Sequence, residues 1–170
     1  MLLNDLIRDV PDFPKQGILF KDITPLLQSP EGLKHTVDQF VNLAAGKGIT
    51  KVVGIESRGF IFGGAIAREL NAGFVPVRKP GKLPSKIISE TYELEYGNDT
   101  IEIHSDAIKQ GDKVLMHDDL LATGGTMKAA CKLVEQLGGE IVQVSFLIEL
   151  SFLNGREKLS LYNIESLIKY

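Results

Sequence analysis

The sequence is poor in the residues that build disulfides and structural metal centres. Its 170 residues include one cysteine, three histidines and no tryptophan. A single cysteine cannot form an internal disulfide, and without a cysteine–histidine cluster no structural zinc site is expected. The thiol of Cys131 falls within an apolar helical pattern, so we expect it to be packed in the core. These absences favour a reducing, cytoplasmic location.

An excess of positive charge and long apolar runs are also missing. The formal net charge is -3, with 24% charged and 44% hydrophobic residues. Such a chain is not expected to bind nucleic acid or an anionic membrane. The short apolar pattern at 1–10 is interrupted by Asp5, Arg8 and Asp9, which predicts neither a signal peptide nor a membrane span. We therefore expect one domain, residues 1–170, with a small-molecule partner.

Strand and helix patterns alternate along most of the chain. Apolar, β-branched runs predict strands at 51–55, 74–77, 114–117 and 141–148, and helical spacing predicts helices at 33–44, 59–70 and 126–137. Between 87 and 104 the period changes to two, and Gly97-Asn98-Asp99 predicts the turn of a β-hairpin. We predict an α/β fold with a central, mainly parallel, twisted sheet flanked by helices. Ligands should bind at the carboxyl ends of its strands.

The most informative segment runs from Val114 to Thr126. Apolar residues lead into two adjacent acids and then into a glycine-rich turn that begins a helical pattern. Carboxylates at a strand end can accept hydrogen bonds from sugar hydroxyls or face a divalent cation. The glycines allow backbone N–H groups to converge at a helix N-terminus, where phosphate binds. The predicted ribose 5-phosphate site consists of Asp118, Asp119, Ala122, Thr123, Gly124, Gly125 and Thr126.

Two other segments favour anion binding. Glu56-Ser57-Arg58-Gly59 joins a strand to a helix and offers a hydroxyl and a guanidinium group. The segment 78–86 contains four cations in nine residues. Taken alone, these features also fit a surface arginine beside a helix cap and solvated loop lysines. Combined with the phosphate turn, they indicate a substrate that is charged at both ends.

Together the motifs resemble the adenine phosphoribosyltransferase family, whose members use 5-phosphoribosyl 1-pyrophosphate (PRPP). The matching segments span nearly the whole chain: 11–27, Glu56–Phe60, Arg78–Pro84, Tyr92–Gly97, 118–126 and Asn154–Leu159. The resemblance implies the type I phosphoribosyltransferase fold, with a small base-binding hood at 1–30 and a flexible flap at 80–104. It further implies a cis peptide bond at Glu56-Ser57, a homodimer, and Mg²⁺ that is held mainly by PRPP, with Asp118 or Asp119 as candidate ligands.

The resemblance also assigns roles to individual residues. Adenine would stack on Phe20 and be read by the main chain of Leu19, near Lys21, which stands where many members have arginine. Glu95 would approach N7 of the base on a flap that includes Tyr96, and Arg58 would assist catalysis. The implied pyrophosphate site consists of Glu56, Ser57, Arg58, Arg78, Lys79 and Lys82. His117 departs from the family's usual apolar residue, and in a buried strand we expect it to be structural.

The implied reaction transfers a 5-phosphoribosyl group to N9 of adenine, which gives AMP and pyrophosphate for purine salvage. One alternative is a phosphoribosyltransferase for hypoxanthine, guanine or xanthine. Another is a PRPP-sensing regulator without catalysis. The retention of Glu95, Arg58 and the lysine-rich flap disfavours the regulator, and an amphipathic interaction module would not explain two anion sites.

Overall fold

The computed structural model describes residues 2–94 and 96–170, and the chain divides into two compact units, Met1–Gln39 and Phe40–Tyr170. The first unit contains η1 (Leu3–Leu6), β1 (Arg8–Pro11), β2 (Leu19–Asp22) and α1 (Thr24–Gln28). Strands β1 and β2 form an antiparallel pair. Helix α2 (Pro30–Ala44) begins in this unit, and its Gly32 N–H donates to Ser29 Oγ at 3.0 Å. Ser29 therefore caps the start of α2.

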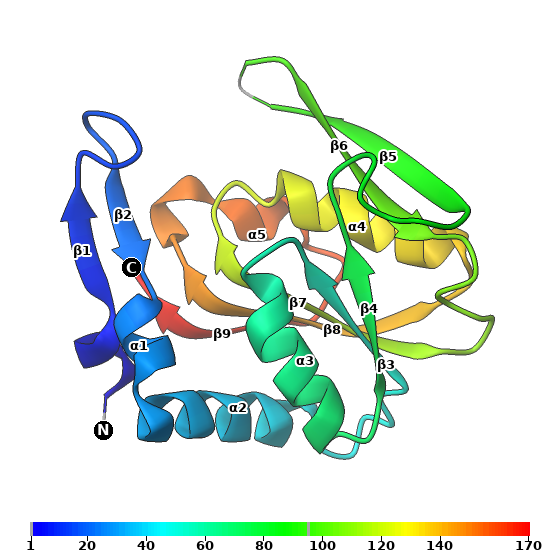
Figure 1. Cartoon of the computed structure of the whole chain (residues 1–170), viewed down its shortest axis with the longest axis horizontal. Helices are drawn as coiled ribbons and strands as arrows, with labels where there is room; N and C mark the ends of the chain where they lie inside the picture. The colour runs from blue at the N-terminus through cyan, green and yellow to red at the C-terminus, as the bar shows by residue number, and fades with distance from the viewer. Residues whose placement is uncertain (1, 95) are drawn as a thin grey trace. The chain divides into compact units, whose positions relative to one another are not determined.

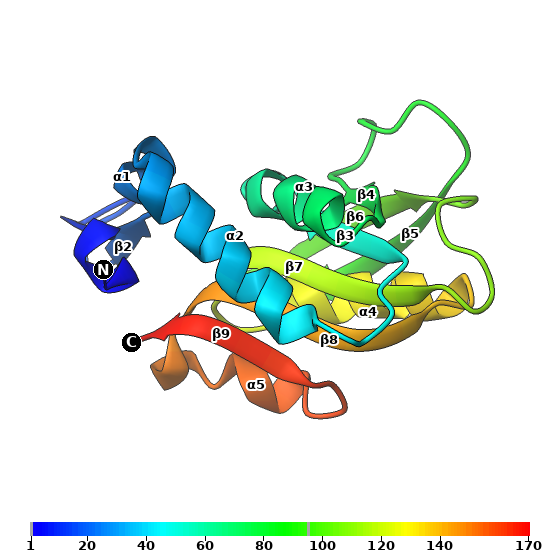
Figure 2. The ribbon, with the colours of Figure 1, turned by 90° about the horizontal axis from the view of Figure 1, so that it is seen from below.

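The second unit contains a five-stranded parallel sheet with the order β4-β3-β7-β8-β9. Its elements are β3 (Lys51–Ile55), α3 (Gly59–Glu69), β4 (Gly73–Val77), β5 (Ile87–Glu93), β6 (Asn98–His104), β7 (Lys113–Leu121), α4 (Gly125–Gln136), β8 (Glu140–Glu149), η2 (Ser151–Leu153), α5 (Gly155–Lys158) and β9 (Ile164–Lys169). Strands β5 and β6 form the predicted antiparallel hairpin. Figures 1 and 2 show how these elements are arranged.

The connections of this sheet determine where a ligand can bind. The crossover from β3 through α3 leads to β4, whereas the crossover from β7 through α4 leads to β8, in the opposite direction across the sheet. Right-handed crossovers in opposite directions place α3 and α4 on opposite faces. The carboxyl ends of β3 and β7, which are neighbours, therefore lie at a topological switch point, where α/β proteins bind ligands.

The core of the second unit is apolar on both sides of the central strands. Val53, Met116 and Phe146 are almost fully buried, and Val144–Glu149 forms a continuous buried run in β8, as its sequence predicts. Cys131 of α4 is fully buried, and burial raises the pKa of its thiol to about 12. The predicted core position of this cysteine is confirmed.

Several boundaries differ from the sequence prediction. Strand β7 runs to Leu121, four residues beyond the predicted end at His117, because β8 continues to pair with it up to Glu149. Strands β1 and β2 and the short helices α1 and α5 were not predicted, because their segments are too short or too irregular to show a period. Strand β9 was not predicted either, because it is an edge strand that is stabilised by pairing with β8. Within the described ranges, no helix is long and apolar enough to span a membrane.

Candidate active site

A cavity of about 330 Å³ lies at the switch point of the sheet. Seven residues that the sequence selects for anion or ribose binding line it: Glu56, Ser57, Arg58, Lys79, Asp118, Asp119 and Thr126. Sequence reasoning missed the apolar part of the wall, which consists of Ile55, Val77, Ile101 and Leu120. The first three are core residues by pattern, and no motif distinguishes them from the rest of the core.

A smaller cavity of about 90 Å³ follows the glycine-rich turn. The predicted phosphate residues Ala122, Thr123, Gly124, Gly125 and Thr126 all line it, and it shares Asp118, Leu120 and Thr126 with the larger cavity. Gly124 has a φ of +83°, a left-handed conformation that favours glycine. Helix α4 begins at the next residue, so the free N–H groups of its first turn belong to the residues that line this cavity.

Two adjacent carboxylates line the cavities: Asp118 borders both of them, and Asp119 borders the larger one. Asp119 is 6% exposed, and Arg58 Nε lies 2.8 Å from Asp119 Oδ2. Asp118 Oδ1 accepts a hydrogen bond from the Asp119 N–H at 2.8 Å. Burial raises the pKa of both carboxyls, and the charge of Asp119 raises that of Asp118 further, well above its ordinary value. Arg58 lowers both pKa values, so Asp119, its ion-pair partner, keeps its negative charge more readily than Asp118 does.

Two of the cations predicted to bind pyrophosphate, Arg78 and Lys82, pair with Glu56. The peptide bond between Glu56 and Ser57 is cis, as the resemblance implies. Glu56 Oε2 accepts a hydrogen bond from the Lys79 N–H at 2.7 Å, while Lys82 Nζ pairs with Oε1 and Arg78 Nη2 lies 3.6 Å from it. Burial raises the pKa of Glu56, but the lysine and arginine contacts outweigh it and lower the pKa. Glu56 is thus an anion that orders cations, rather than a donor to a bound anion.

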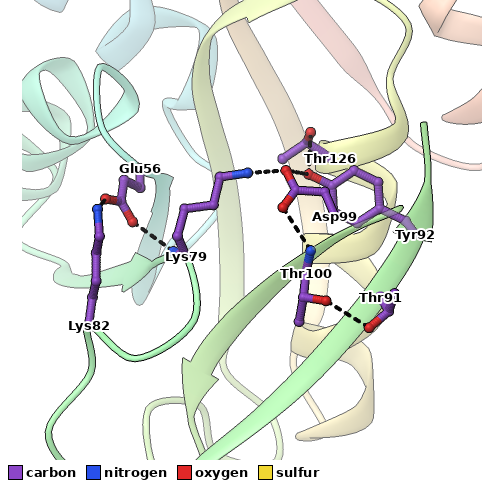
Figure 3. A network of polar contacts seen from close by, with 8 residues as sticks. All are labelled: Glu56, Lys79, Lys82, Thr91, Tyr92, Asp99, Thr100 and Thr126. Atoms are coloured by element: carbon purple, nitrogen blue, oxygen red, sulfur yellow. Dashed lines mark hydrogen bonds and ion pairs between the residues drawn. The ribbon is translucent and has the colours of Figure 1, made fainter. Parts of the chain in front are cut away.

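A polar network joins the larger cavity to the β5–β6 hairpin (Figure 3). Lys79 Nζ pairs with Asp99, whose Oδ2 also lies 3.2 Å from Tyr92 Oη. Tyr92 Oη lies 2.9 Å from Thr126 Oγ1 at the start of α4. Burial lowers the pKa of Lys79, but the contact with Asp99 outweighs it and raises the pKa. Sequence reasoning missed Asp99 because it assigned Gly97-Asn98-Asp99 to the turn. That assignment is wrong for Asn98 and Asp99, which belong to β6, where Asp99 pairs with Tyr92.

The predicted adenine residues belong to the first unit. Leu19, Phe20 and Lys21 lie on β2, and the ring of Phe20 contacts that of Phe13 edge-on with centroids 5.1 Å apart. Lys21 Nζ lies 2.6 Å from Asp9 Oδ1.

The resemblance assigns two neighbouring flap residues, Glu95 and Tyr96. Tyr96 is 84% exposed. Glu95, predicted to be catalytic, lies outside the described residues.

His117 is a buried residue of β7. Its Nδ1 lies 3.1 Å from Ser145 Oγ, and its ring meets that of Phe40 edge-on at 4.9 Å. Burial lowers the pKa of His117 to about 3, so the imidazole is neutral at physiological pH. It does not line either cavity. These observations support the structural role that the sequence predicts.

A parallel sheet with adjoining carboxylate, cation and phosphate-turn sites at its switch point defines a phosphoribosyltransferase. The family described as the phosphoribosyl transferase domain matches residues 23–161. An adenine phosphoribosyltransferase of Flavobacterium johnsoniae is 60% identical over the full length of both chains, and one of Christiangramia forsetii is 60% identical over all of this chain and 99% of its own.

Solved structures agree with these sequence matches. The adenine phosphoribosyltransferase of Thermoanaerobacter pseudethanolicus has a TM-score of 0.96 at 50% identity and covers 99% of this chain and 98% of its own. That of Saccharomyces cerevisiae, solved with adenine and an imino-altritol bisphosphate, has a TM-score of 0.93 at 43% identity and covers 97% and 96%. The chain belongs to the phosphoribosyltransferase family, among the adenine phosphoribosyltransferases. The predicted fold class is confirmed.

Proposed function

We propose that the protein transfers the 5-phosphoribosyl group of PRPP to N9 of adenine and releases AMP and pyrophosphate, a reaction of purine salvage. The observation that carries this proposal is the pair of adjoining cavities, one with cations near its wall and one formed by a glycine-rich turn. PRPP carries a phosphate at one end of its ribose and a pyrophosphate at the other. The two cavities share Asp118, a carboxylate that would lie near the ribose between the two charged ends of PRPP.

The chain's own residues bind and orient the two substrates. The residues 122–126 bind the 5-phosphate through backbone N–H groups and threonine hydroxyls, while Asp118 and Asp119 accept hydrogen bonds from the ribose hydroxyls. N9 of adenine attacks C1′ with inversion as the bond to pyrophosphate breaks. Negative charge then grows on the leaving group, where Ser57, Arg58, Arg78, Lys79 and Lys82 stabilise it.

The carboxylates also fit a Mg²⁺ ion that arrives with PRPP. In the part of the chain that the structure describes, no group of three or more His, Cys, Asp or Glu residues is placed to hold a metal. Mg²⁺ is commonly bound by one or two carboxylates together with substrate phosphates, rather than by protein ligands alone. Asp118 and Asp119 match this kind of site. Asp118 or Asp119 would hold the ion, which when bound neutralises charge on pyrophosphate.

Strand β2 supplies the proposed base site. Adenine stacks on Phe20, while the Leu19 carbonyl accepts from the exocyclic amine and the Leu19 N–H donates to a ring nitrogen, near Lys21. Pro11 pairs with Leu19 in the β1–β2 register and has no N–H to donate to that carbonyl. A 6-oxopurine presents the opposite hydrogen-bonding pattern, and each unpaired buried group costs about 1–3 kcal/mol.

We expect a spectrophotometric assay with Mg²⁺ and PRPP to show a preference for adenine of about 1000-fold in kcat/KM over hypoxanthine, guanine and xanthine. The size of this preference follows from two mismatched hydrogen bonds in the base site. Equal or faster turnover of a 6-oxopurine would select the alternative transferase. Binding of PRPP without turnover of any base would identify a regulator.

Glu95 tests the proposed role of the flap. If its carboxyl approaches N7 as the base loses its N9 proton, Glu95→Gln retains a hydrogen bond and Glu95→Leu removes it. We expect kcat to fall about 10-fold in the glutamine variant and about 100-fold in the leucine variant. The exposed neighbour Tyr96 provides a control for damage to the flap through Tyr96→Phe, which retains the ring. Wild-type turnover in both Glu95 variants would remove this residue from the mechanism.

The family supports further proposals about the whole chain. We propose that residues 1–170 act as one phosphoribosyltransferase domain in a cytoplasmic homodimer. Residues 1–30 form the base-binding hood, and the flap at 80–104, which includes Tyr96, closes to exclude water from the reaction. Light scattering coupled to size-exclusion chromatography would test the dimer. Limited proteolysis with and without PRPP would test whether the flap becomes protected.

A further inference from the structure

The segment between β8 and β9 has no role in the chemistry above. Its motif, Asn154–Leu159, forms part of the resemblance to the family, yet none of its residues lines either cavity. The segment contains η2 and α5, and α5 contacts α4, the helix that follows the phosphate turn. Figure 1 shows α5 near the start of α4. Because Asn154–Leu159 lines neither cavity, any effect of this motif on the substrate must pass through the residues that it contacts.

The backbone of Gly155 packs directly against the phosphate turn. A Cβ at Gly124 would lie 2.6 Å from the Gly155 carbonyl oxygen, and a Cβ at Gly155 would collide with the carbonyl oxygen of Ala122. The N–H of Leu150 donates to the Leu121 carbonyl at 2.9 Å, which fixes the start of the segment to the end of β7. The backbone of Gly155 therefore lies directly against the turn, and neither Gly124 nor Gly155 has space for a side chain.

Arg156 connects the backbone next to Gly155 to strands β8 and β9 of the sheet. Its Nε and Nη2 lie 2.6 and 2.9 Å from the two carboxylate oxygens of Glu149, at the end of β8, and its Nη1 donates to the Ile164 carbonyl at 3.2 Å, at the start of β9. Glu149 is only 4% exposed, and Leu159, at the other end of α5, is fully buried in the core. A guanidinium fork with three directed bonds defines the position of a backbone segment much better than a single contact does.

We propose that residues 154–156 form a buttress that holds the 5-phosphate turn in its binding conformation, and that Arg156 is a positioning residue for PRPP. This inference rests on the proposed function, since it assigns the turn to the 5-phosphate. A turn held from behind keeps its N–H groups converged before the phosphate arrives, so less ordering accompanies binding. The Arg156 guanidinium binds Glu149 and the Ile164 carbonyl, whereas Arg78 and Lys82 pair with Glu56, so the two groups of contacts involve different residues.

We therefore expect variants of the buttress to weaken binding at one end of the substrate. Arg156→Lys keeps Glu149 paired but loses the fork, and Gly155→Ala pushes against the Ala122 carbonyl. In calorimetry, Kd for ribose 5-phosphate should rise about fivefold in the first variant and more than tenfold in the second. Kd for magnesium pyrophosphate should change less than twofold in both. KM for PRPP should rise while kcat stays within twofold, because phosphate binding contributes equally to the ground state and the transition state.

Lys169→Met is the matched control, because Lys169 Nζ also faces Glu149, at 4.0 Å, but lies on β9. It should bind both probes as the wild type does. If wild-type protein fails to bind ribose 5-phosphate, the proposed function itself is wrong, and the buttress fails with it. If the wild type binds and folded Arg156→Lys binds equally well, or loses both probes to the same extent, only the buttress is wrong. Thermal unfolding identifies the folded variants, and Arg156→Lys leaves no buried charge unpaired.

Discussion

Replacing Asp118 with asparagine is expected to stabilise the protein at neutral pH and to lower kcat/KM about 100-fold. Burial and the neighbouring charge of Asp119 raise the pKa of Asp118 well above its ordinary value. Asparagine removes the charge, and its side-chain oxygen can still accept the Asp119 N–H that now donates to Asp118 Oδ1 at 2.8 Å. The loss of activity follows because a carboxylate that orients the ribose becomes a weaker acceptor, and misplaced reacting atoms cost about 100-fold.

The stabilisation has a defined dependence on pH. When the pKa of a carboxyl is higher in the folded protein than in the unfolded chain, the group's contribution to the free energy of unfolding is complete below the unfolded-state pKa. This contribution is lost as the pH rises through the folded-state pKa. Asp118→Asn and wild type should thus have equal melting temperatures at low pH, where both side chains are neutral. The melting temperature of the variant should increasingly exceed that of wild type as pH rises toward neutral. Thermal unfolding from pH 4 to 8, with parallel kinetics, measures both effects.

Asp112 provides a control of opposite sign. Burial raises its pKa, but hydrogen bonds from the Lys109 N–H and the Thr50 hydroxyl, both at 2.8 Å, outweigh burial and lower it. The contribution of Asp112 to the free energy of unfolding is present above the unfolded-state pKa and is lost as the pH falls through the folded-state pKa. Asp112→Asn should therefore lower the melting temperature at neutral pH and leave kcat unchanged. A melting temperature of Asp118→Asn below that of wild type at pH 8 would contradict a raised pKa of Asp118 in the folded protein.

Replacing Gly124 with alanine is expected to disrupt the phosphate turn. The residue has a φ of +83°, and an added Cβ would lie 2.6 Å from the Gly155 carbonyl oxygen. The left-handed conformation costs an alanine about 1–2 kcal/mol, and overpacking adds about 1–3 kcal/mol. The turn must then shift, so its N–H groups no longer converge. We expect the melting temperature to fall by roughly 5 °C or more and Kd for ribose 5-phosphate to rise at least 30-fold.

Gly64 is the matched control for this variant. It lies inside helix α3, and a Cβ added there would meet nothing within 4 Å. Gly64→Ala should therefore stabilise the protein by about 0.5–1 kcal/mol and leave ribose 5-phosphate binding unchanged. Calorimetry well below the melting temperature separates the loss of binding from the loss of folding. Wild-type affinity in Gly124→Ala would show that the turn does not hold the phosphate.

The sequence was most informative where residue spacing and local conformation coincide. Period and apolar runs identified β3, α3, β8 and the β5–β6 hairpin, because these segments have a regular period and clear turn residues. The same patterns predicted the ends of strands less well. The end of β7 depends on its pairing with β8, which no local pattern in the sequence indicates. The edge strand β9 escaped prediction for the same reason, since it is stabilised by its neighbour rather than by its own pattern.

The alternation of strands and helices, the glycine-rich turn and the separate motifs of the family can be read from the sequence, because each of them depends on residues that are close together along the chain. The partners of these residues depend on the tertiary fold. Arg58 pairs with Asp119, Lys79 with Asp99, and Gly155 lies behind Gly124. Each contact joins segments at least 20 residues apart, and its geometry is fixed by strand order, hairpin register and close backbone packing rather than by local preference.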